Sequence, residues 1–136
     1  NNWYKIISTN GIYSFSSDIL DDPSTSTTSG ASYSLDVTAS NSSDYTLSGT
    51  DRNGNISGND PDLTFSVGDT ISFVVNASGH PFYLKTTAGT GTGNTISGIT
   101  NNGTTNQTIS WTPTSAGTFY YQCSLHGGMV GTITIQ

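Results

Sequence analysis

The residues best suited to metal chemistry gather near the C-terminus, in the stretch YYQCSLHGGMVGTITIQ. This stretch holds the only cysteine of the chain (Cys123), the only methionine (Met129) and one of the two histidines (His126). Cysteine offers a soft thiolate, histidine a ring nitrogen and methionine a soft thioether. Two histidines and one cysteine with a weakly bound methionine form the trigonal site of a blue copper centre. The stretch therefore predicts a copper site, if a second histidine reaches it.

The second histidine must be His80, which follows the stretch TISFVV. Alternate residues of TISFVV are apolar, the pattern of a strand with one buried face. His80 is then expected at the end of a sheet, where a loop from another part of the chain can meet it. Cys123 is expected to end one strand, Met129 to begin the next, and His126 to lie on the short loop between them.

The composition predicts the scaffold that positions these residues. Ser, Thr, Asn and Gly dominate, and no long run of helix-forming residues occurs, so strands joined by polar turns are favoured over helices. Seven tyrosines, five phenylalanines and two tryptophans supply apolar area for a core. The spacing of the short apolar segments predicts an all-β Greek-key sandwich of seven or eight strands.

The N-terminal part is predicted to be separate from this sandwich. The runs WYKII and IYSFS flank Asn10-Gly11, a pattern typical of a β-hairpin. DDPSTSTTSG then has the composition of a linker rich in Ser and Thr. We therefore expect a hairpin or arm with its linker in residues 1–30 and the sandwich domain in residues 31–136.

From about Asp44 to Gln136, the sequence resembles the cupredoxins, the small blue copper proteins that include plastocyanin, azurin and amicyanin. VGDTISFVVNASGH resembles the family's strand and first histidine ligand, and SAGTFYYQCSLHGGMVGTITI resembles its closing segment, with the short amicyanin-type spacing of ligands. The resemblance implies a cupredoxin-like fold, one type 1 copper ion and one-electron transfer. It also implies the ligands, which are His80, Cys123 and His126 in the trigonal plane and Met129 on the axis.

One position departs from the family pattern. The family usually has Asn or Ser after the first histidine, whereas this chain has Pro81. Proline has no backbone N–H, so one hydrogen bond that the family directs at the cysteine sulfur is expected to be missing. If copper binds, we expect a lower reduction potential than is usual for the family.

Other interpretations of the same residues stay open. A lone cysteine is more often a buried thiol than a ligand, and a family member can keep the fold without loading its metal. The alternative function is a structural or decoration module of a larger extracellular or virion surface assembly, with copper structural or absent. The long N-terminal extension, the start at Asn1 rather than Met and the absence of Glu favour that alternative. GHPFYLKTTAGTGTGN also resembles segments of cupredoxin-type modules in marine bacterial and phage surface proteins.

The remaining sequence features limit the function further. The net charge of −6 argues against binding nucleic acid, and no apolar run approaches the roughly 18 residues of a membrane span. No catalytic triad, glutamate pair or phosphate-binding loop is recognisable, so we do not expect an enzyme. The composition suggests an exported protein of the periplasm, cell surface or virion surface. The expected partner is a redox protein that docks on the apolar rim around His126 (Leu125, Gly127, Gly128), or else neighbouring subunits of a surface assembly.

Overall fold

Strands and loops make up residues 30–136, the part of the chain that the computed structural model describes. This part has no helix, and therefore none that could cross a membrane, so the all-β prediction is confirmed there. The predicted N-terminal hairpin and nearly all of its linker lie outside the described residues. The proposed domain boundary at residue 31 stays a prediction.

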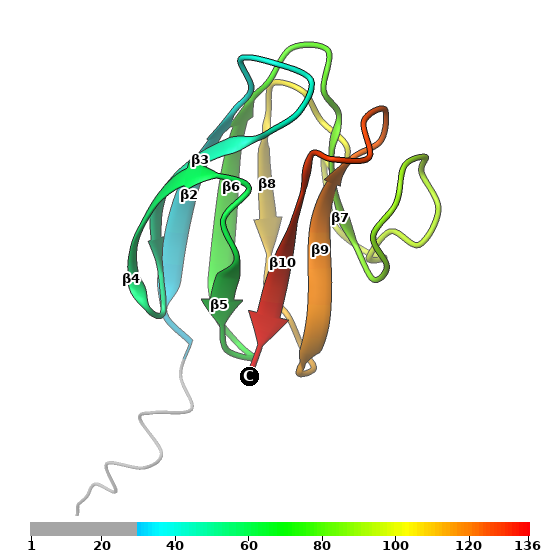
Figure 1. Cartoon of the computed structure of the whole chain (residues 1–136). Helices are drawn as coiled ribbons and strands as arrows, with labels where there is room; N and C mark the ends of the chain where they lie inside the picture. Colours follow the sequence, from blue (N-terminus) through cyan, green and yellow to red (C-terminus); the bar gives the residue numbers. More distant parts are fainter. Residues whose placement is uncertain (1–29) are drawn as a thin grey trace, which may run out of the picture.

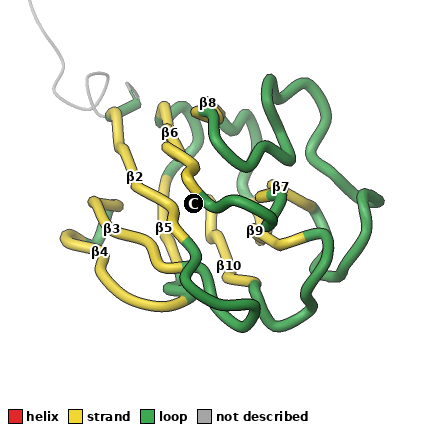
Figure 2. The backbone as a smooth tube through the Cα atoms, turned by 90° about the horizontal axis from the view of Figure 1, so that it is seen from above, coloured by secondary structure: helices red, strands yellow, loops and turns green. Residues whose placement is uncertain are grey.

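The strands of the described part form two facing sheets (Figure 1), and Figure 2 shows the two layers from above. The first sheet has four strands in the order β5 (Leu63–Phe65), β10 (Val130–Ile135), β9 (Gly117–Cys123) and β7 (Phe82–Lys85). The second has five, in the order β4 (Gly54–Asn59), β3 (Thr46–Asp51), β2 (Ser32–Thr38), β6 (Thr70–Asn76) and β8 (Thr108–Trp111). Two neighbouring pairs, β2–β6 and β5–β10, are parallel, and the others are antiparallel. The predicted sandwich is confirmed.

The described residues contain nine strands, one more than the upper prediction of eight. The additional strand is β4, whose sequence GNISGN contains one apolar residue and so lacks the alternation that marks a half-buried strand. β4 pairs with β3 through a tight turn in which the Asp51 carboxylate accepts the N–H of Asn53 at 2.8 Å. Turn chemistry and an edge position therefore account for a strand that the apolar pattern does not reveal.

The core lies between the two sheets and contains the alternating residues predicted from the sequence. Ile71, Phe73 and Val75 of β6 are all buried. The ring of Phe82 stacks on Tyr121 with the ring centres 5.4 Å apart, and it lies 5.3 Å from the ring of Phe73. These contacts join β6, β7 and β9, the strands that lead to the predicted metal site.

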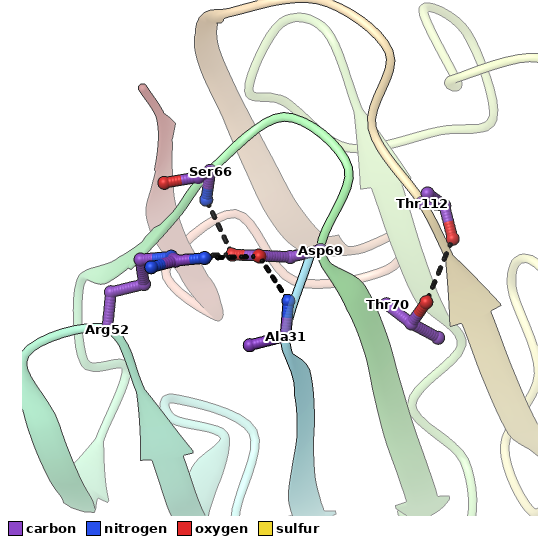
Figure 3. A network of polar contacts seen from close by, with 6 residues as sticks. All are labelled: Ala31, Arg52, Ser66, Asp69, Thr70 and Thr112. Carbon is purple, nitrogen blue, oxygen red and sulfur yellow. Dashed lines mark hydrogen bonds and ion pairs between the residues drawn. The ribbon is translucent and has the colours of Figure 1, made fainter. Parts of the chain in front are cut away.

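A buried carboxylate, Asp69, immediately precedes β6 and so lies at the end of that strand farther from His80. Figure 3 shows the groups that it contacts. Asp69 accepts hydrogen bonds from Arg52 at 2.7 and 3.0 Å and from the backbone N–H groups of Ala31 at 2.9 Å and Ser66 at 2.7 Å. The hydrogen bonds from the Arg52 guanidinium hold the pKa of Asp69 at about 2, although burial opposes that shift. This carboxylate therefore connects the start of β2, the β3–β4 turn and the loop between β5 and β6.

Candidate metal site

Two loops that are far apart in the sequence meet at one end of the sandwich. The connection from β6 to β7 carries His80, and the connection from β9 to β10 carries His126. The two connections lie at the upper end of the sandwich in Figure 1. Antiparallel pairing of β7 with β9 places Phe82 opposite Cys123. The N–H of Ser124 also donates to the carbonyl oxygen of Pro81 at 3.3 Å. Strand register therefore brings His80 beside the end of β9.

The predicted histidine and cysteine ligands form one cluster. The Cys123 Sγ lies 3.9 Å from Nδ1 of His80 and 3.5 Å from Nδ1 of His126, and the ligand atoms all lie within 4.8 Å of one another. Taking the bond lengths of about 2.1 Å to nitrogen and 2.3 Å to sulfur that zinc sites show, a trigonal ion separates its nitrogen and sulfur ligands by roughly 3.8 Å. The observed distances lie on either side of this value, so the three side chains can hold such an ion.

The burial of these residues suits a metal ion near the surface but shielded from water. Cys123 is fully buried, and both histidine rings are half-buried. Met129 is fully buried among the core residues, and its N–H donates to the carbonyl of His126 at 3.2 Å. Cys123 is the last residue of β9, and Met129 immediately precedes β10. The role of all four residues as metal ligands stays a prediction.

Solved structures of rusticyanin share this arrangement of strands. The structure from Thiobacillus ferrooxidans superposes with a TM-score of 0.54 at 21% sequence identity and covers 79% of each chain. Another, titled as the copper protein rusticyanin, gives a TM-score of 0.54 at 21% identity and covers 79% of this chain and 80% of that one. The chain has the cupredoxin fold. An oxidized amicyanin mutant is 29% identical over 56% of this chain and 70% of its own, with a TM-score of 0.39. No family model and no curated protein matches the sequence.

Within the cupredoxin fold, the backbone at His80 is fixed by a buried tyrosine. The Tyr45 hydroxyl donates to the carbonyl of His80 at 2.8 Å, and the His80 N–H donates to the carbonyl of Ala77 at 2.9 Å. Burial raises the pKa of Tyr45 above its ordinary value. Tyr45 therefore remains a neutral hydrogen-bond donor beside the cluster.

The loop from Ser124 to Met129, which carries His126 and is called the metal-site loop below, is supported by two further residues that the sequence-based prediction did not include. Gln122 supports it directly, and Lys85 supports it through the neighbouring segment from Gly89 to Gly91. The Gln122 side chain is buried under the loop and hydrogen-bonds to several of its carbonyls, and Lys85 is buried in β7. The sequence does mark Lys85 as unusual, since it is the only charged residue between Thr70 and Gln136. Gln122 has none, because a polar residue between Tyr121 and Cys123 is expected on the exposed face of a strand.

Proposed function

We propose that the chain binds one copper ion at a type 1 site and carries single electrons, with His80, Cys123 and His126 as trigonal ligands and Met129 as the axial one. The observation that carries this proposal is the convergence of one cysteine sulfur and two imidazoles within 4.8 Å at the loop end of a cupredoxin fold. The donor set supports copper, because a trigonal site of two histidines and one cysteine with a weak methionine is typical of blue copper proteins.

The ion would supply the one-electron chemistry by alternating between Cu(I) and Cu(II), and the protein residues would hold it in a fixed shape. Cys123 lies at the end of a strand that is paired on both sides, and the aromatic residues of the core pack against that strand. Packed interiors resist deformation, so the ligands are expected to move little when the charge of the site changes. The fully buried thiolate is also expected to be kept away from water.

The partner is proposed to be another redox protein that docks on the apolar rim around His126. Leu125 is 62% exposed, and Gly127 and Gly128 beside it are also exposed. The half-buried ring of His126 would give the electron a short route between this rim and the site. We propose an electron carrier rather than an enzyme. On the basis of the composition, we also propose that the protein is exported to the periplasm or to a cell or virion surface.

Titration of the purified protein with Cu(II) tests this function. We expect one equivalent to bind with the intense blue absorption of a thiolate bound to copper, and voltammetry to give a reversible one-electron couple. Binding of copper without a reversible couple would favour a structural module in a surface assembly. Absence of both the colour and the binding would contradict the proposal.

Replacing Pro81 tests whether a missing hydrogen bond to the Cys123 sulfur lowers the reduction potential. Pro81→Asn supplies a backbone N–H that can donate to the sulfur. Such a hydrogen bond withdraws electron density that the sulfur would otherwise give to Cu(II), so it disfavours the oxidised state and raises the reduction potential. A hydrogen bond is worth about 1 kcal/mol, and a tenfold change in a one-electron equilibrium is about 59 mV, so we expect voltammetry to show an increase of tens of millivolts. Pro81→Ala is the matched control, because it restores the backbone N–H without adding the side-chain carboxamide of asparagine. A similar increase in this variant would assign the effect to the backbone N–H. An unchanged potential in both variants would refute this explanation.

A further inference from the structure

The side chain of Gln122 contacts the backbone of three of the four proposed ligands. It is 1% exposed, and its Nε2 lies 3.0 Å from the carbonyl oxygen of Cys123, 3.0 Å from that of His126 and 3.3 Å from that of Met129. A carboxamide nitrogen has two N–H groups, so these carbonyls share them. One buried side chain thus holds the loop at both of its ends and at its middle.

The other end of the same carboxamide connects the metal-site loop to the loop that follows β7. The Gln122 Oε1 accepts the N–H of Gly89 at 3.1 Å. Two residues further on, the N–H of Gly91 donates to the carbonyl of Ser124 at 2.8 Å. The segment from Gly89 to Gly91 therefore lies along the metal-site loop and covers the face of β9 that carries Gln122.

The buried side chain of Lys85 holds this covering segment in place through two hydrogen bonds. Its side chain is 2% exposed, and its Nζ donates to the carbonyls of Gly89 at 2.6 Å and Gly91 at 3.2 Å. Within residues 30–136, the one ion pair joins Arg52 and Asp69, so the Lys85 ammonium is balanced by carbonyl dipoles rather than by a carboxylate. A buried charge is costly without such partners, and the carbonyls of Gly89 and Gly91 supply them.

We propose that Gln122 is the positioning residue of the metal site and that Lys85 supports it through the peptide groups of Gly89. This inference rests on the proposed function, because it assigns these residues to the copper site. Hydrogen bonds in such a buried network strengthen one another. Residues that orient metal ligands commonly change affinity by about 10–100-fold when they are replaced. The network would therefore hold the loop in its metal-binding shape before the ion arrives.

The first test uses the protein without metal. Gln122→Met keeps the length of the side chain but removes its hydrogen bonds, and Gln107→Met on an exposed loop is the matched control. We expect hydrogen exchange of the Cys123 and Met129 amides to accelerate about tenfold in Gln122→Met alone, with no change in the amides of β6. Unchanged exchange of the Cys123 and Met129 amides would overturn the proposal.

The second test adds Cu(II) to the same variants. We expect the affinity of Gln122→Met to be about 10–100-fold lower than that of the parent and of Gln107→Met, with a shifted blue absorption band. If the parent binds copper and Gln122→Met binds it equally well, the proposal is overturned. If the parent itself binds no copper, the proposed function fails, and the exchange measurement still decides whether Gln122 orders the loop.

Lys85→Met removes the other side chain that holds the segment from Gly89 to Gly91, and it remains informative if Gln122→Met does not fold. We expect faster exchange of the Gly91 amide and a lower copper affinity. In the double variant, the combined loss of copper affinity should be clearly smaller than the sum of the two single losses, because each replacement breaks the same network. Additive losses, or wild-type exchange and affinity in Lys85→Met, would overturn the role of Lys85.

Discussion

Cys123→Ser is expected to abolish the blue absorption of the copper-loaded protein completely. The colour requires a thiolate bound to copper, and a serine hydroxyl is a hard, weakly acidic donor that does not replace a soft sulfur ligand. The two remaining imidazoles can still hold copper weakly. Replacing residues that only orient ligands already costs about 10–100-fold in affinity, so we expect a loss of more than about 100-fold. Absorption spectroscopy and competition with a copper chelator measure the two effects.

Met129→Leu is the matched control for this experiment. It replaces a buried side chain of the same loop by one of similar volume, which cores tolerate. Since the axial ligand is weak and distant, this variant should keep the blue colour while its reduction potential changes. Retention of the colour in Cys123→Ser, or its complete loss in Met129→Leu with the fold intact, would contradict the assigned roles.

Asp69→Asn is expected to lower the free energy of unfolding by about 3 kcal/mol at pH 7, the largest loss of stability that we predict for a polar residue. The carboxylate is fully buried and accepts four hydrogen bonds, two of them from Arg52 (Figure 3). Breaking a buried charged pair costs about 3–5 kcal/mol, and the partial exposure of Arg52 places this case at the lower end. Urea denaturation measures the difference.

The pH dependence gives the same prediction a second, independent test. The pKa of Asp69 is lowered to about 2 in the folded protein, from an ordinary value of 3.8. Its charged form therefore stabilises the fold above pH 3.8, and this contribution is lost as the pH falls from about 4 to 2. The gap between the parent and Asp69→Asn should narrow over that range. The exposed Asp36→Asn is the control, and an equal effect of both substitutions would show that Asp69 has no special role.

The sequence predicted the scaffold well where burial follows a simple pattern. Ile71, Phe73 and Val75 alternate and are all buried, because a strand with one face on the core must place every second residue inside. β4 was missed because turn chemistry and pairing with β3, rather than burial of an apolar face, hold its residues in place.

The composition of the site was also predictable, but its support was not. Rare residue types pointed to His80, Cys123 and His126 as candidate ligands, and the structure brings their ligand atoms together. Alternation predicts that Gln122 is exposed, yet it is buried, because the segment around Gly89 covers the outer face of β9. Such a cover depends on tertiary contacts between loops, and no local pattern reports it. The predicted axial role of Met129 remains to be tested.

X-ray absorption at the copper edge of the loaded protein tests the central claim most directly, because it counts the atoms bound to the ion. We expect one short bond to sulfur and two bonds to imidazole nitrogen, with any second sulfur distant and weak. In His80→Ala, one imidazole nitrogen should disappear from the spectrum while the short sulfur remains. A spectrum of the parent with nitrogen and oxygen ligands but no short sulfur would contradict the proposed site.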